Sequence, residues 1–235
     1  MTSTAQQQDD FRNKPLYGIP EASRYLLIPP ATLRSWTFGR YYPTSTGRRF
    51  FRPLLSLPDK HRPFLSFVNL VEAHVLDAIR RHHNIPLHKV RRALDYLQSS
   101  AKSLHPLADQ GFETDGIDLF VQKYGQLISI SESGQTAMRR MLEAHLRRIE
   151  HGPTGAPMRL YPFTRKREHD EPRLIMIDPG ISFGRPVLTG TGIATSIIAE
   201  RYKGGESIED LVNDYERSRE EIEEAIRCEL RLDAA

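Results

Sequence analysis

Arginine side chains between residues 40 and 52 are the group whose type and spacing most clearly suit a chemical task. They stand on two β-prone runs, residues 41–43 and 49–51, which the turn-forming residues 44–47 join into a predicted hairpin. Guanidinium groups bind phosphates by charge and by paired hydrogen bonds, so such a hairpin suits the backbone of a nucleic acid. The sequence therefore predicts a basic wing. Its arginines are Arg40, Arg48, Arg49 and Arg52.

Two short helices are expected to position this wing. Pro20 begins the first, which runs to Leu26, and Pro30 begins the second, which Gly39 ends. A helix–turn–helix followed by a basic wing can place one helix in the major groove and the wing on the phosphates. The alternative is a helical pair with a solvated arginine-rich loop, but charge and helix layout together favour DNA. Four residues are predicted on or near the outward face of the second helix: Thr32, Arg34, Ser35 and Thr37.

No catalytic or metal site is predicted. The adjacent His82 and His83 point to different sides of a helix, and no cysteine or carboxylate completes a site around them. The glycine-rich stretch 188–192 lacks the lysine of a phosphate-binding loop and fits a tight strand-to-helix turn better. Without a nucleophile–base pair, a metal-ligand spacing or a cofactor loop, the sequence favours a protein that is not an enzyme and has no cofactor.

Positive charge is concentrated at one end of the chain, although the net charge is only +3. Residues 1–100 hold 15 Lys and Arg against 7 Asp and Glu, and residues 101–174 hold 11 against 10. Residues 175–235 reverse the sign, with 7 against 13. We therefore expect the N-terminal part to meet a polyanion and the acidic C-terminal part to meet protein.

The sequence predicts a cytoplasmic protein that does not enter a membrane. If it binds DNA as expected, it is associated with the nucleoid. No apolar run approaches the ~20 residues that span a bilayer, and the first residues lack the apolar core of a signal peptide. Cys228 is the single cysteine, which excludes an internal disulfide and suits a reducing compartment.

The predicted fold is mainly α with small β elements. Residues 1–14 are expected to be a disordered polar tail, residues 15–98 a winged helix, residues 99–177 a mixed α/β middle with a linker near 152–157, and residues 178–235 a helical domain. Ser66 is expected to begin a long helix that Asn84 ends, and Pro86 to begin the next. The middle is expected to contain a turn at 114–116, hairpin strands at 117–121 and 126–131, a helix at 135–150, and strands at 159–163 and 173–177.

Residues 17–97 resemble the winged-helix domain of the MerR type. The matching stretches, in order, are YGIPEASRYL, ATLRSW, GRRFFRP and SFVNLVEAHVLDAIRRHHNIPLHKVRRALDYL. The resemblance implies a DNA-binding helix–turn–helix with a wing and a following helix pair. The chain differs from that family in a longer link, SLPDKHRPFL, and in lacking a long helix directly afterwards.

The C-terminal part is similar to a small all-helical domain family of formerly unknown function that occurs in antitoxins. The matching pattern includes the turn-forming residues Gly184, Pro186, Gly190, Thr191 and Gly205. Three helices are expected, at 194–202, at 208–215 after a Ser207 cap, and at 219–232 after a Ser218 cap. Glutamates at the start of the last helix would repel phosphate, so dimerisation or partner binding is favoured over DNA binding there.

In this order the two domains resemble VapB-type antitoxins, which are paired with PIN-domain ribonuclease toxins. The resemblance implies a protein that inhibits a toxin nuclease, binds double-stranded operator DNA of its own operon, and does both as a homodimer. Because a PIN nuclease has an acidic metal site, an arginine reaching into it is one possible mechanism. Arg165, Arg167 and Arg173 are the candidates. The alternative is a stand-alone MerR-like regulator whose residues 100–174 respond to a small effector.

Overall fold

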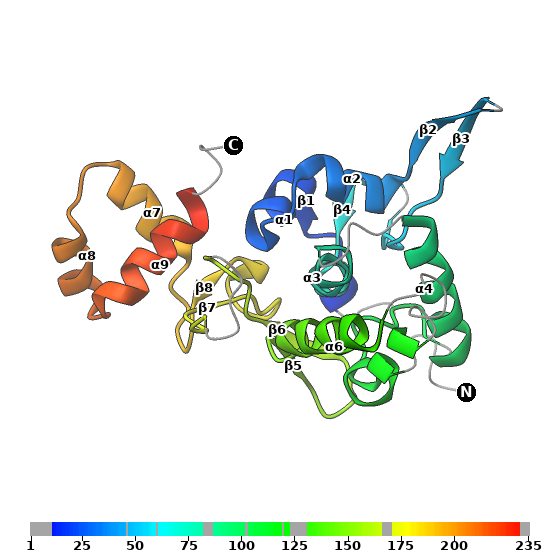
Figure 1. Ribbon diagram of the computed structural model, residues 1–235. Coiled ribbons are helices and arrows are strands. Elements are labelled where there is room, and N and C mark those ends of the chain that lie inside the picture. Colours follow the sequence, from blue (N-terminus) through cyan, green and yellow to red (C-terminus); the bar gives the residue numbers. More distant parts are fainter. Residues whose placement is uncertain are drawn as a thin grey trace, which may run out of the picture.

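The computed structural model is mainly helical, with four small antiparallel sheets of two strands each in the part it describes (Figure 1). It describes residues 11–45, 47–59, 61–81, 87–101, 103–118, 120–122, 131–165 and 171–230. A wing extends from one end of the molecule, and the three C-terminal helices lie at the other (Figure 1). No helix within these ranges is both long and apolar enough to cross a membrane.

The head, residues 15–98, begins as the sequence predicts. After the 3₁₀ turn Phe11–Asn13, strand β1 (Tyr17–Gly18) leads into helix α1 (Ile19–Leu26). Leu27 ends α1 in the left-handed conformation, with φ 54°, and helix α2 (Pro30–Phe38) follows. The wing is the hairpin of β2 (Arg40–Thr44) and β3 (Gly47–Phe51), and β1 pairs with β4 (Phe64–Leu65). The predicted helix bounds and hairpin are confirmed to within a residue or two.

Helix α3 (Phe67–Arg81) runs through the centre of the molecule and is followed by α4 (Leu87–Ala101). Ser66 caps α3 as predicted, since its hydroxyl accepts a hydrogen bond from Asn69 N at 3.2 Å while Asn69 Oδ1 accepts one from Ser66 N. Residues 67–79 are all buried, including polar residues at positions where an amphipathic helix would meet water. The predicted end at Asn84 and start at Pro86 lie outside the described residues.

The strand predicted at residues 117–121 is wrong. Residues 110–118 and 120–122 are helical, with a π turn at Phe112–Gly116 where the sequence predicts a β-turn. Ile117, Phe120 and Val121 are all buried, and their i, i+3, i+4 spacing puts them on one face of a helix. A short apolar run can serve a strand or a helix, and here packing against the core selects the helix. Residues 123–130, which include most of the second predicted strand, lie outside the described residues.

Helix α6 (Glu132–Leu146) begins after Ser131, whose hydroxyl accepts a hydrogen bond from Gly134 N at 3.2 Å. Strands β5 (Ile149–His151) and β6 (Pro157–Leu160) then pair with each other. The predicted linker near 152–157 is therefore a hairpin loop, closed by a 2.9 Å hydrogen bond from Gly152 N to Ala156 O. A bridge between Leu160 and Ile177 carries this hairpin to β7 (Ile175–Met176), which pairs with β8 (Val187–Leu188).

The tail, residues 178–235, forms the three predicted helices: α7 (Thr195–Lys203), α8 (Ile208–Tyr215) and α9 (Arg219–Leu230). Ser207 caps α8 in a full capping box with Asp210, and Ser218 exchanges equivalent bonds with Glu221. These helices enclose their own small core around Ile198, Leu211 and Ile222. Cys228 belongs to that core, where burial raises the pKa of its thiol and keeps it protonated.

One partly buried ion pair makes the stability of the fold depend on pH. His105 Nδ1 lies 3.0 Å from Oε2 of Glu72, a buried residue of α3. Burial lowers the pKa of His105, but the hydrogen bond and charge of Glu72 outweigh that effect and raise it above the ordinary 6.5. The stabilisation is therefore fully present below about pH 6.5, where the unfolded chain also carries the proton, and is lost as pH rises through the folded-state pKa.

We predict that in His105→Gln the free energy of unfolding changes less with pH than in wild type. Wild type should lose stability relative to the variant as the pH rises above 6.5, and the two curves should separate most at low pH. Urea unfolding between pH 5.5 and 9 measures the difference, with the exposed His61→Gln as the matched control. Parallel curves for wild type and His105→Gln would contradict the assignment.

Candidate nucleic-acid interface

Helix α2 packs one face against the core and exposes the opposite face to solvent. Leu33 and Trp36 are fully buried, where they meet the core that α1 and α3 share. Arg34 is exposed and Thr32 is half-buried. Pro30 at the first helical position and Gly39 directly after the last residue set the length of α2, so the orientation of Arg34 follows from local sequence.

The prediction that Ser35 and Thr37 lie on the outward face is wrong. Ser35 is only 7% exposed and Thr37 only 3%. The two residues are two positions apart and so face nearly opposite sides of α2, and both sides are covered. The link that follows the wing is held at the end of this helix, where Leu54 N and Leu55 N donate hydrogen bonds to Trp36 O at 2.7 and 3.1 Å. The Thr37 hydroxyl donates within its own helix, to Leu33 O at 3.0 Å. Of the four predicted residues, Thr32 and Arg34 remain in a position to contact DNA.

The wing carries its charge on a short, regular hairpin. Tyr42 pairs with Arg49 and Pro43 with Arg48, and the rings of Tyr41 and Phe50 lie 5.0 Å apart on one face. Stacking of the Arg48 guanidinium, 5.8 Å from the Tyr41 ring centre, restricts that side chain without neutralising it. All four predicted wing arginines are exposed: Arg40, Arg48, Arg49 and Arg52.

Arg91 fixes the base of the wing, a role that sequence analysis missed. It projects from α4, donates hydrogen bonds to the carbonyl oxygens of Arg52 and Pro53, and lies over the ring of Phe51 at 5.2 Å. Burial lowers the pKa of Arg91, yet the guanidinium stays charged at neutral pH. The pairing joins residues 39 positions apart, so no local pattern could have indicated it.

Gly39 sets the angle between α2 and the wing. Its φ of +73° is in the region that residues with a side chain rarely adopt, and a Cβ there would lie 2.2 Å from Phe51 O. The strand partner of Arg40 thus passes directly over the glycine. Helix and wing are therefore held in one arrangement at the end of the head (Figure 1).

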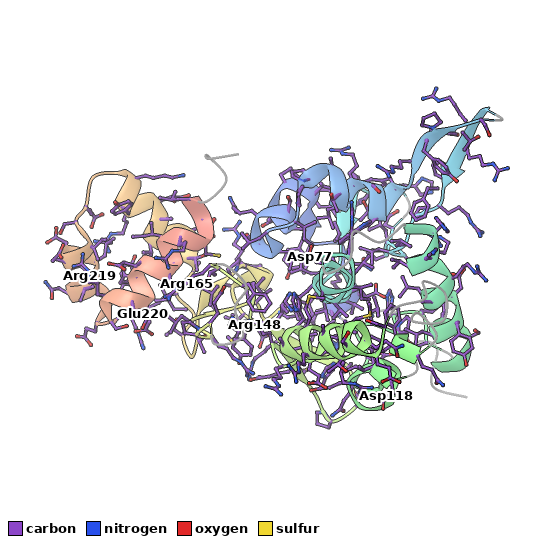
Figure 2. All side chains as sticks on the ribbon, viewed as in Figure 1. Asp77, Asp118, Arg148, Arg165, Arg219 and Glu220 are labelled. Atoms are coloured by element: carbon purple, nitrogen blue, oxygen red, sulfur yellow. The ribbon has the colours of Figure 1, made fainter. Side chains whose placement is uncertain are left out.

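The three arginines predicted to meet a toxin occupy different environments. Arg165 is paired inside the chain: its Nη2 lies 3.0 Å from Glu220 Oε1 and 2.9 Å from the buried Glu224 Oε2 of α9 (Figure 2). Arg173 is exposed, although it lies over the Tyr161 ring at 5.3 Å and donates to the carbonyl of Arg147. Arg167 lies outside the described residues.

The turn residues that carry the resemblance of the tail lie in three connections: Gly184 between β7 and β8, Gly190 and Thr191 between β8 and α7, and Gly205 between α7 and α8. Gly184, Gly190 and Gly205 have φ values of +76°, +76° and +99°, and thus need the conformational freedom of glycine. Thr191 Oγ1 donates to Leu188 O at 2.8 Å and accepts from Ile193 N at 3.1 Å. Pro186 O accepts the bond from Thr195 N that begins α7. Within the described ranges, no three His, Cys, Asp or Glu side chains group as metal ligands.

Comparison with known proteins supports both ends of the chain. Residues 15–94 match the family described as "Putative DNA-binding HTH domain", and residues 175–227 match "Protein of unknown function (DUF433)". The chain is 27% identical over 228 residues to "Putative antitoxin VapB45" of Mycobacterium tuberculosis, a match covering 90% of this chain and 92% of that protein. The resemblance to a VapB-type antitoxin is confirmed.

A solved structure supports the fold. The crystal structure of Rv2018 from Mycobacterium tuberculosis superposes with a TM-score of 0.65 at 24% identity, over 91% of this chain and 98% of that one. The order of head, middle and tail is therefore an arrangement that a crystal structure also contains.

We predict that Gly39→Ala destabilises the protein by about 1–3 kcal/mol, because the new Cβ meets Phe51 O and the residue keeps a left-handed φ. The urea midpoint should fall accordingly. Gly111→Ala is the matched control: its backbone is α-helical and a Cβ there meets nothing within 4 Å, so this change should not lower stability. Equal effects at both positions would show that the close approach at Gly39 does not constrain the wing.

Proposed function

We propose that this protein is the antitoxin of a toxin–antitoxin pair, a non-enzymatic cytoplasmic regulator that binds operator DNA as a dimer and neutralises a PIN-type ribonuclease. The observation that carries the proposal is the exposed arginine wing beside Arg34, on a chain that resembles a VapB antitoxin over 90% of its length. Exposed guanidinium groups on a rigid hairpin can follow a phosphate backbone, and a helix of nine residues fits a major groove.

The arginines of the wing and the arginine of α2 would contact different parts of the DNA. Arg48 and Arg49 lie on the hairpin and would contact phosphates, which are alike at every sequence. Arg34 lies on the helix proposed to enter the groove, where a guanidinium can bind guanine through two hydrogen bonds. One head makes few contacts, so paired half-sites read by two copies are required for a tight operator complex.

On the toxin side, exposure favours Arg173 over Arg165. The Arg165 guanidinium is within 3.0 Å of two carboxylates of α9, and removing it from them would leave the buried Glu224 without one of its cationic partners. Arg173 can reach outward with the loss of one hydrogen bond to a main-chain carbonyl and of its contact with the Tyr161 ring, and it leaves no buried carboxylate unpaired. We therefore place the basic contact with the toxin at Arg173.

The alternative, a regulator that responds to a small effector in its middle region, finds less support. The depression there, of about 250 Å³, is rimmed by charged residues of the helical turn and α6, including Glu113, Arg139 and Glu143. Pockets for small ligands are usually larger, about 300–1,000 Å³, and mostly apolar, so this depression does not suit an effector, whereas a groove of about 610 Å³ lined in part by Arg159 and Tyr161 has the size for one. Purification of the protein from its native operon, with mass spectrometry of what stays bound, distinguishes the two: a nuclease supports the antitoxin, and a retained metabolite supports the regulator.

For DNA, we predict that Arg48→Ala and Arg49→Ala each weaken binding to operator and to unrelated DNA by a similar factor, and each reduce the slope of log K against log salt by about 1. Arg34→Ala should instead reduce discrimination between operator variants, by about 1–3 kcal/mol at the contacted base pair. Fluorescence anisotropy across a salt series measures both quantities. Arg140→Ala, an exposed arginine of α6, should leave them unchanged. Wing variants that match wild type at every salt concentration would refute the docking arrangement.

For the toxin, we predict that Arg173→Glu weakens inhibition of the co-purified ribonuclease by roughly tenfold or more, because a carboxylate would then face the acidic metal site. Ribonuclease assays titrated with each variant measure the change, and Arg140→Glu provides a matched charge reversal at an exposed position. Full inhibition by Arg173→Glu would exclude this arginine from the contact.

A further inference from the structure

Phe183 has an unusual combination of side chain and surroundings. Its ring is 90% exposed, more than any other large apolar residue in the described part of the chain. A single exposed apolar side chain is ordinary by itself. Here, however, the backbone that presents the ring is strained, and an apolar groove lies next to it.

The strain lies in a left-handed turn. Ser182, Phe183 and Gly184 have φ values of 48°, 56° and 76°, so two residues with side chains adopt a conformation that glycine tolerates far better. Such strain persists only where surrounding contacts enforce it, and it is concentrated at functional sites.

Hydrogen bonds at both ends of the turn enforce this conformation. Ser182 Oγ donates to Gly192 O at 3.0 Å, and the buried Tyr17 hydroxyl donates to Gly184 O at 3.0 Å. A Cβ at Gly184 would lie 2.4 Å from the Tyr17 oxygen, so the glycine is needed for this close approach. The tail and the head thus both hold the turn that leaves Phe183 in water.

A groove of about 610 Å³ shares the surface with this turn. Its apolar lining comes from Tyr161, Met176 and Ile181, and Ile181 directly precedes the turn. The loop Thr189–Gly192 forms its rim, and Gly192 accepts the bond from Ser182 that fixes the turn. Phe183 is not among the residues that line the groove.

The charge in the groove is balanced locally. Arg159, which also lines it, lies 3.0 Å from Glu150 Oε2 and 3.1 Å from Asp178 Oδ2. An aromatic ring entering the groove would therefore meet a neutralised guanidinium and apolar side chains, and it would not bury an unpaired charge.

We propose that this surface joins two copies of the chain, with Phe183 of each copy seated in the groove of the other. A two-fold interface requires one patch that is complementary to itself, and an exposed ring beside an apolar groove meets that requirement. The proposal rests on the dimer invoked in the proposed function and identifies the residues that form it.

The area is adequate for the centre of such an interface. Two phenylalanine side chains bury roughly 300–500 Å². That is about a quarter of a standard interface of ~1,600 Å², and the loops at 180–185 and 189–192 surround it to contribute the rest. Aromatic residues seated centrally in a pocket are also the usual anchors of binding energy.

A second copy fits the observations better than the toxin. A toxin would have to supply its own pocket for Phe183, whereas this chain carries ring and groove together on one surface. The same contact would also place two heads in one particle, as paired half-sites require.

The test is the oligomeric state of the full-length protein, measured by sedimentation velocity over a micromolar concentration series. Wild type should be a dimer. Phe183→Asn should raise the dimer dissociation constant by about a hundredfold or more, while its far-UV circular dichroism should match that of wild type, because asparagine tolerates a left-handed φ better than phenylalanine and the monomer still folds. Ile197→Asn, a change at a 50% exposed residue of α7 that does not line the groove, should remain dimeric.

A second variant tests the groove with Phe183 intact. Gly192→Leu places a side chain at the rim, where a Cβ meets nothing within 4 Å, so the variant should fold normally and lose the dimer. A wild-type monomer at every concentration, or a Phe183→Asn protein that stays dimeric, would overturn the proposal. If that dimeric variant also fails to retain the nuclease, Phe183 contacts the toxin instead. Sedimentation uses neither DNA nor toxin, so its result stands apart from the fate of the antitoxin assignment.

Discussion

The burial of α3 on every side is the constraint on which the rest of the structure depends. Side chains around its whole circumference, from Phe67 to Ile79, are buried, and α1, α6 and strands β4 and β6 all pack against it. A helix enclosed in this way belongs to a core and cannot serve as a surface element. Because α1 belongs to the head and α6 to the middle, one continuous core extends from Tyr17 to Ile177. The wing and the tail project from opposite ends of this shared body (Figure 1).

Because α3 is enclosed, its polar side chains need hydrogen-bond partners inside the protein. Those partners lie on the segments between the helices and strands, and the bonds hold these segments in place. Asn69 donates to Ser56 O at 2.9 Å and so holds the link after the wing, while Glu72 holds the loop at His105. His74 Nε2 lies 3.1 Å from His145 O at the end of α6. Beside it, the buried Arg148 guanidinium (Figure 2) donates to four main-chain carbonyls, and its burial lowers its pKa to about 10. Polar contacts of this kind cost too much to leave unmade in a core, so they fix the path of the chain.

The features that the sequence predicted correctly are those with local signals, and the errors arose where distant segments decide. Proline at helix starts, glycine after α2 and the Ser207 cap depend on neighbouring residues, so the bounds of α1, α2 and α8 could be predicted. The burial of Ser35, whose side chain is only 7% exposed, comes from tertiary packing that no residue near it in the sequence indicates. The ion pair of Arg165 could not be predicted either, because its partner Glu220 lies 55 positions away, and its contact with a toxin stays a prediction. At Ile117 the same apolar residues satisfy a strand and a helix, and only the core distinguishes them.

The joint between head and tail determines how the two ends of the molecule can influence each other. Arg24 of α1 lies 3.2 Å from Glu229 of α9, and Glu229 also accepts a 2.6 Å hydrogen bond from Thr195 at the start of α7. Burial opposes the charge on Arg24, but Glu229 outweighs it and raises the pKa of the guanidinium. The Arg24 side chain is 30% exposed, so solvent screens this pair and reduces its contribution to stability, but the contact still links α1 to α9. Since α2 packs on α1, a displacement of α9 would be transmitted to the helix that carries Arg34. Any ligand of the tail that changes the affinity for DNA must, by thermodynamic reciprocity, have its own affinity changed by DNA to the same degree.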